Sequence, residues 1–186
     1  RGADRAMWMN EVAAAAETFA FCRRIGCPRV VVSAFAEDPD GQAVDALRQA
    51  GDRAVRHGLT LAVRNEAGAR ATAAELATLL DAAAHPAVRA CWSPADALGV
   101  GEDPEAGLAA LNGRVEVVVV RDGLMKGAEW EPRPLGEGAV GWERLLRRLH
   151  ERAFSGALCL DLRGRTPKEG LKDATALVYL LRGARR

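Results

Sequence analysis

Polar and charged side chains follow apolar runs at several points of this 186-residue chain. They are Arg64, Asn65, Glu66, Ser93, Asp96, Asp122 and Asp161. Four of them are carboxylates, and a carboxylate can act as a general acid or base when burial raises its pKa. The amide, hydroxyl and guanidinium groups among them suit the binding of a polyol or another small polar ligand. Side chains of these types can carry out acid–base chemistry or bind a polar ligand when a fold brings them together.

Cysteine and histidine show no pattern typical of a metal site or a nucleophile. The cysteines are scattered and form neither a C-x-x-C motif nor a cluster with histidine, so we interpret them as buried apolar thiols. They are Cys22, Cys27, Cys91 and Cys159. The three histidines lie in or beside segments with a helical pattern, and none resembles a catalytic base. They are His57, His85 and His150.

The segments that would position these residues alternate between strand and helix. Apolar runs predict strands at 30–32, 59–63, 88–92, 115–120 and 157–160, and the first four begin roughly 30 residues apart, the spacing of a βαβ unit. Helical patterns cover 11–24, 41–57, 72–84, 104–112, 141–152 and 168–181. Thr72 and Glu75 form a capping box, and Gly58 and Gly113 suit helix C-termini. Strands buried on both faces and alternating with helices predict a parallel sheet, in a doubly wound fold or part of a (β/α)8 barrel.

Composition limits the classes of protein that fit. The chain is 49% hydrophobic with a net charge of +1, which suits one globular domain over residues 1–186 and gives no basic surface for nucleic acid. No apolar run reaches the length of a membrane helix and no leader pattern opens the chain, so we expect a cytoplasmic location. Neither G-x-G-x-x-G after the first strand nor G-x-x-x-x-G-K-[ST] occurs. We interpret "PLGEG", residues 134–138, as a turn with a packing role.

Five segments in order resemble a known family. They are "HGLTLAVRNEAG" (57–68), "VRACWSPADAL" (88–98), "RVEVVVVRDG" (114–123), "RPLGEGAVGWERLLRRL" (133–149) and "FSGALCLDLRG" (154–164). Their order and spacing resemble the C-terminal part of the sugar phosphate isomerase/epimerase family, the xylose-isomerase-like TIM barrels. The resemblance implies an α/β, TIM-barrel-like fold with about five parallel β/α units, matching the fourth to the eighth. The first units would then be missing from this sequence and supplied by preceding residues or by a partner chain, most simply a second copy in a homo-oligomer.

The resemblance also implies what has happened to the family's metal site. Family members hold a divalent cation with Glu, Asp, His and Glu at the ends of the last four strands. The matching positions here are Arg64, Ser93, Val119 and Asp161. Arginine is a cation without an acceptor and valine has no donor atom, whereas a hard divalent cation needs several oxygen or imidazole ligands. We therefore expect no metal and no other cofactor, and we predict that Arg64 forms a salt bridge with Asp161, with Ser93 or Asp122 sharing its remaining donors.

Other family positions are partly kept. Asn65 matches the family's asparagine, Glu66 replaces a histidine, and Asp96 stands where a histidine contacts substrate. Asp122 matches a family aspartate, and Arg133 matches an arginine before L-G-x-G. The resemblance thus assigns ligand binding to Arg64, Asn65, Glu66, Ser93, Asp96 and Arg133, and any remaining catalysis to Asp161 and Asp122.

Simpler interpretations stand beside these roles. Asp122-Gly123 is also typical of a turn, Asp96 of a helix cap, Arg133 of a loop charge, and the tryptophans at 92 and 130 of packing residues. Three functions remain open. The first is a barrel protein that binds a small polar or sugar-like ligand without metal-dependent isomerisation. The others are an isomerase- or epimerase-like enzyme with metal-free acid–base chemistry, and a structural or interaction subunit.

Overall fold

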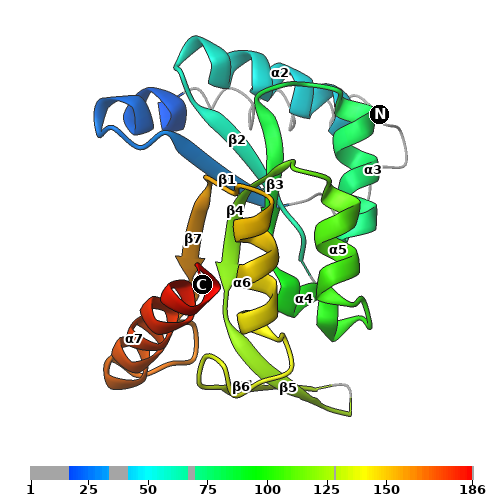
Figure 1. Ribbon diagram of the computed structural model, residues 1–186. Helices are drawn as coiled ribbons and strands as arrows, with labels where there is room; N and C mark the ends of the chain where they lie inside the picture. The colour runs from blue at the N-terminus through cyan, green and yellow to red at the C-terminus, as the bar shows by residue number, and fades with distance from the viewer. Residues whose placement is uncertain (1–16, 34–41, 67–69, 128, 186) are drawn as a thin grey trace.

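The computed structural model describes residues 17–33, 42–66, 70–127 and 129–185. Five strands form one parallel sheet in the order β1-β2-β3-β4-β7. They are β1 (Arg29–Ser33), β2 (Thr60–Arg64), β3 (Val88–Trp92), β4 (Val115–Val120) and β7 (Ala157–Leu160). The five predicted strands are thus confirmed, and the sheet curls into a half-barrel (Figure 1).

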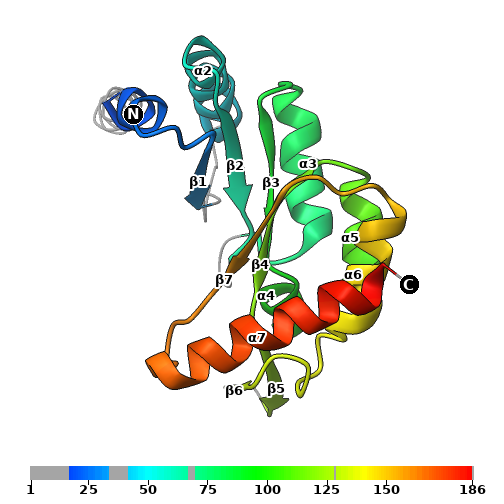
Figure 2. The same cartoon turned by 60° about the vertical axis from the view of Figure 1, so that its left-hand side comes forward.

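Helices cover the outer face of this sheet. They are α2 (Gln42–Arg56), α3 (Ala73–Ala83), α4 (Pro94–Gly99), α5 (Pro104–Leu111), α6 (Trp142–Glu151) and α7 (Pro167–Ala184), together with a helix at 17–24. Figure 2 shows α3, α5 and α6 on one side of the strands, with the other side of the sheet left open. The predicted helices are confirmed where they are described, and the first part of the helix expected from Glu11 lies outside the described residues. No helix in these ranges is both long and apolar enough to span a membrane.

The helix ends follow the predicted capping residues. Thr72 accepts a hydrogen bond from the Glu75 N–H, and the Glu75 carboxylate accepts one from the Thr72 N–H, which completes the capping box. Asn112 ends α5 in the left-handed conformation at φ 42°. Thr166 and Glu169 form a second capping box that was not predicted. Helix α7 begins at Pro167 and continues to Ala184, beyond the predicted end at residue 181.

The four consecutive valines of β4, residues 117–120, face both sides of the sheet, as their run predicts. Val118 and Val120 lie in the main core between sheet and helices. Val117 and Val119 face the concave side. They share that inner layer with Ala62 and Cys91, because alternate residues of parallel strands point the same way.

The prediction of four buried thiols is wrong. Only Cys91 is buried, Cys22 and Cys27 are partly exposed, and Cys159 is exposed. Cys159 lies on β7, which pairs only with β4 within the described sheet, so fewer neighbours cover it.

An antiparallel hairpin was not predicted. It consists of β5 (Asp122–Lys126) and β6 (Glu129–Arg133), and Gly123 pairs with Pro132. Its sequence lacks the apolar alternation of a half-buried strand, and Pro132 argues against a strand interior. A side chain at Gly123 would lie 2.5 Å from the Trp130 ring, so only glycine fits beneath this tryptophan.

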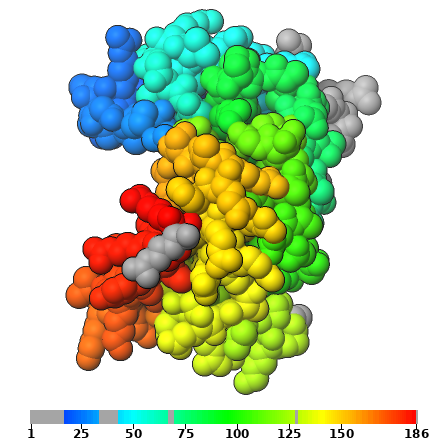
Figure 3. All heavy atoms as spheres, in the orientation of Figure 1, coloured from blue at the N-terminus to red at the C-terminus, as the bar shows by residue number. Residues whose placement is uncertain are grey.

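Apolar side chains are exposed on the edge strand β1 and on helix α7, which follows the other edge strand, β7. Val31 on β1 is 48% exposed, and Leu171 and Tyr179 on α7 are 71% and 67% exposed. In Figure 3 an open notch separates the blue segment near β1 from the red helix α7. The expectation that further β/α units or a second copy complete the sheet stays a prediction, as does the cytoplasmic location.

Candidate functional site

The carboxyl ends of the strands gather charged side chains on the concave side. Strand alternation places Arg64 after Ala62 on β2, Arg121 after Val119 on β4, and Asp161 after Cys159 on β7. The carboxyl ends of parallel strands meet at one rim of the sheet, which in (β/α) barrels is the rim that carries active sites. The concave face is therefore apolar along the strands and charged at this rim.

The predicted salt bridge between Arg64 and Asp161 is present. An Nη2 atom of Arg64 lies 3.8 Å from Asp161 Oδ2. The same nitrogen donates to Asp96 Oδ2 at 3.2 Å. Glu66 Oε1 lies 3.8 Å from Arg64 Nε, too far for a hydrogen bond. The expected sharing by Ser93 or Asp122 is wrong, because Asp96 accepts the hydrogen bond and Glu66 lies only within ion-pair distance.

Asp96 connects Arg64 to a second arginine that the sequence reading missed. Its other oxygen, Oδ1, accepts a hydrogen bond from Arg121. The guanidinium of Arg121 stacks on Trp130, with its carbon 5.1 Å from the ring centroid. The alternation of residues 117, 119 and 121 along one strand face is the sequence signal that could have identified Arg121. Asp96 makes no helix-cap hydrogen bond, so its carboxylate serves the two arginines.

Asp161 binds a third arginine, Arg163, which was likewise not predicted from the sequence. Arg163 donates from Nε to both carboxylate oxygens at 3.0 Å and from Nη2 to Oδ2 at 2.6 Å. These hydrogen bonds hold the pKa of Asp161 below its ordinary value, against the opposite effect of burial. We use the term mouth network for Arg64, Glu66, Asp96, Arg121, Asp161 and Arg163. Three guanidinium groups and three carboxylates balance its formal charge.

Replacing Arg163 with alanine should raise the pKa of Asp161, because burial remains while the largest opposing influence is lost. A carboxyl whose folded-state pKa is depressed adds stability above its unfolded pKa of about 4 and loses it as pH falls through the folded value. The stability difference between wild type and variant should therefore be full near neutral pH and shrink below about pH 4. Carboxyl ¹³C NMR titration measures the shift directly. Arg147→Ala is the surface control and should leave the titration midpoint of the Asp161 carboxyl unchanged. An unchanged midpoint in Arg163→Ala as well would contradict this assignment.

Asp122 organises the loop after the hairpin. Its buried carboxylate accepts backbone hydrogen bonds from Gly123 and Val140 through Oδ1, and from Gly136 and Gly138 through Oδ2. A side chain at Gly138 would lie 2.1 Å from Asp122 Oδ1, so the carboxylate fits only against glycine. The interpretation of "PLGEG" as a packing turn is confirmed. The geometry favours a structural role for Asp122, and its catalytic assignment stays a prediction.

Asn65 ties the ends of β2 and β3 together. It is fully buried, accepts from the Ser93 N–H at 2.7 Å, and donates to the carbonyls of Ser93 and Ala71. Its amide is thus used within the fold. The Ser93 hydroxyl is buried as well, yet Oγ has no hydrogen-bond partner. Ser93 begins α4 without capping it.

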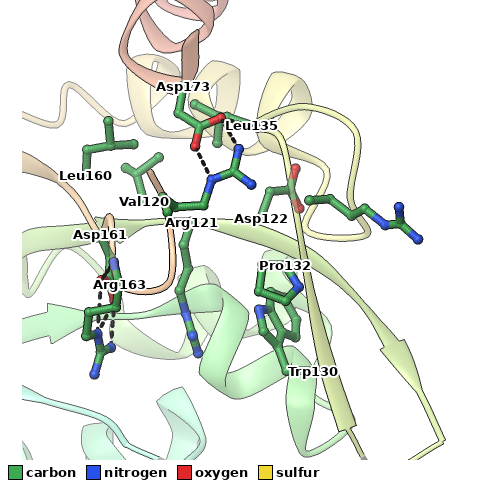
Figure 4. A pocket seen from close by; sticks show the side chains of 12 residues that line it. Val120, Arg121, Asp122, Trp130, Pro132, Leu135, Leu160, Asp161, Arg163 and Asp173 are labelled. Carbon is green, nitrogen blue, oxygen red and sulfur yellow. Dashed lines mark hydrogen bonds and ion pairs between the residues drawn. The ribbon is translucent and has the colours of Figure 1, made fainter. Parts of the chain in front are cut away.

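A small pocket opens beside the mouth network, between the end of β4, the hairpin and the residues after β7 (Figure 4). It encloses about 380 Å³, including the solvent at its opening. Arg133 lines it and pairs with Glu131 at 3.0 Å. Arg165 closes one side through a two-pronged ion pair with Asp173, whose carboxylate also accepts from the Leu135 N–H. Trp130 lies in its wall, and Trp92 is a fully buried packing residue.

The residues at the rim do not fit a divalent cation. Arg64 places a guanidinium, which has no lone pair, beside Asp96 and Asp161. Both carboxylates already accept hydrogen bonds from arginine, and Val119 contributes only methyl groups. In the described ranges, no group of three or more His, Cys, Asp and Glu residues is arranged to hold a metal.

The fold and the rim together define part of a (β/α) barrel with a polar mouth. The chain belongs to the xylose isomerase-like TIM barrel family, whose model matches residues 2–181. No curated protein sequence matches it.

Solved structures support this fold. A xylose isomerase domain protein from Planctomyces limnophilus is 24% identical with a TM-score of 0.78, and the match covers 95% of this chain and 65% of that one. A xylose isomerase-like TIM barrel protein from Mycobacterium smegmatis, in complex with magnesium, is 16% identical with a TM-score of 0.80, covering 95% and 67%. An L-ribulose 3-epimerase is 16% identical with a TM-score of 0.76, covering 94% and 68%. The chain thus spans about two thirds of their length.

Proposed function

We propose that this protein binds a small polar or sugar-like ligand at the mouth of the barrel and does not catalyse metal-dependent isomerisation. The observation that carries the proposal is the guanidinium of Arg64, bound to Asp96 and close to Asp161 at the rim where the family resemblance places the metal. A guanidinium supplies a local positive charge and directional donors, but it is no Lewis acid. The rim thus retains groups for binding without the group that activates a carbonyl.

The fold supports the location of the ligand. Barrels of this kind bind ligands at the carboxyl ends of their strands, and the L-ribulose 3-epimerase and the magnesium-bound Mycobacterium smegmatis protein share this fold. Fold alone does not determine chemistry. The proposal therefore rests on the composition of the rim and takes from the relatives only the place of the site.

Metal-free acid–base catalysis has less support. A carboxylate that acts as an acid near neutral pH needs a raised pKa, whereas Arg163 lowers the pKa of Asp161. Asp96 lies between two arginines and Asp122 is used by the loop. A role as an interaction subunit would use the exposed edges described above, and a sizing measurement tests it.

Metal binding separates this proposal from an ordinary family member. After incubation with Mn²⁺ and gel filtration, the wild-type protein should retain well under one equivalent of metal by elemental analysis. It should also be inactive in an aldose–ketose isomerisation screen. A triple variant, Arg64→Glu, Ser93→Asp and Val119→His, restores oxygen and imidazole ligands beside Asp161 and should gain metal.

Arg64→Glu alone is the matched control, because it adds one carboxylate without completing the ligand set. Circular dichroism confirms that each variant is folded. One tightly bound equivalent in the wild-type protein, lost in Asp161→Asn, would refute the proposal.

A further inference from the structure

The mouth network has an excess of hydrogen-bond donors. Each guanidinium carries five N–H groups and accepts nothing. The carboxylates are heavily used: Asp96 bridges Arg64 and Arg121, and Asp161 receives Arg163 on both oxygens. Two arginine nitrogens, Nε of Arg64 and Nε of Arg121, are nevertheless buried without a partner. A ligand that completes this network must therefore bring acceptor oxygens.

Glu66 marks where such an oxygen belongs. Its Oε1 lies 3.8 Å from the unpartnered Arg64 Nε. Its negative charge also acts on Arg163, whose pKa is raised chiefly by Asp161 and to a smaller degree by Asp96 and Glu66. Glu66 thus lies within the electrostatic reach of two arginines. Its side chain is 38% exposed and makes no hydrogen bond within the described residues.

The charge balance specifies the ligand further. When Glu66 moves out to solvent, three guanidinium groups and two carboxylates remain, which leaves one net positive charge. One carboxylate on the ligand neutralises it. A neutral sugar in the place of Glu66 would leave this charge uncompensated beside the largely buried Arg64, and a phosphate dianion would overcompensate it.

The unpaired hydroxyl of Ser93 adds a second recognition element. Ser93 lies just after β3, two residues beyond Cys91 of the inner layer, which by strand alternation turns it toward the same concave side. Its buried Oγ can both donate and accept. A hydroxyl with both a free donor and a free acceptor suits hydrogen bonding to a hydroxyl group of the ligand. Within the proposed binding function, and resting on it, we propose that the ligand is a hydroxy carboxylate of the sugar-acid class. Its carboxylate displaces Glu66 in front of Arg64, and a hydroxyl group bonds to Ser93.

Calorimetric titration with matched probes tests this inference. The probes are xylonate and gluconate, their neutral counterparts xylitol and sorbitol, and glucose 6-phosphate. Each sugar acid should bind at least about tenfold more tightly than its alditol, since one charge-assisted hydrogen bond of this kind is worth roughly that factor. Glu66→Gln removes the competing carboxylate and should tighten sugar-acid binding further. Ser93→Ala should weaken it.

Glu129→Gln, on the exposed hairpin, is the matched control and should leave all affinities unchanged. A role of Glu66 in folding alone would alter the unfolding midpoint without altering the preference for acids. Alditols that bind as tightly as acids, or a Glu66→Gln variant that binds acids no better, would overturn the inference and leave the proposed function intact. Tighter binding of the phosphate would overturn the carboxylate assignment, and no binding by any probe would overturn both proposals.

Discussion

Replacement of Asp96 by alanine is expected to lower the free energy of unfolding by about 2–4 kcal/mol. The Asp96 side chain is only 10% exposed and accepts from Arg64 on one oxygen and from Arg121 on the other. Without it, both guanidinium groups lose their hydrogen-bonded counter-ion in a site where little water compensates them. Chemical denaturation followed by circular dichroism measures the loss.

Two comparisons give this result its meaning. Asp45→Ala removes an exposed partner of Arg48 on α2, and it should cost at most about 0.5 kcal/mol because exposed ion pairs contribute little. Asp96→Asn keeps the shape and one acceptor oxygen but no charge, so its effect should lie between the other two. If Asp96→Ala costs no more than Asp45→Ala, Asp96 does not hold the network together.

The sequence predicted the sheet because its strands have a strong physical signature. Apolar, β-branched runs at the spacing of βα units can be recognised without any partner information, and the buried valines of β4 are the clearest instance. The hairpin lacked this signature. The sequence of β6 is EWEPR. Trp130 of this strand packs directly over Gly123, a tertiary contact that no local pattern reveals.

The candidate site was predicted in part for a similar reason. The pairing of Arg64 with Asp161 followed from charge replacement at positions that converge on one point. Arg121 and Arg163 were overlooked because the family motif drew attention to the metal ligands rather than to the next residue of the same strand face. Asn65 shows what a local pattern does not reveal, since its amide bonds to the backbone of Ser93, and its ligand-binding assignment stays a prediction. Only coordinates distinguish these uses.

Asp122→Ala should have the largest effect on folding of any single substitution at the rim. Four backbone N–H groups, from Gly123, Gly136, Gly138 and Val140, lose their acceptor together. Each unsatisfied buried donor costs about 1–3 kcal/mol, and water that enters the opened loop recovers part of this, so we expect a loss of about 3–5 kcal/mol. Hydrogen exchange should show faster exchange at the amides of 136–140.

Asp122→Asn separates this structural role from the catalytic one. The amide keeps one acceptor oxygen but turns an NH₂ group toward backbone N–H donors, so it should destabilise the loop nearly as much as alanine does. A catalytic carboxylate behaves differently, because its amide variant keeps the fold and loses only turnover. The Trp142 indole donates to the Arg121 carbonyl and anchors the same region independently, so Trp142→Phe should loosen it far less. The variant Asp122→Asn could instead unfold at the same denaturant concentration as the wild type. If its amides at 136–140 are also equally protected from hydrogen exchange, the carboxylate is not what orders this loop.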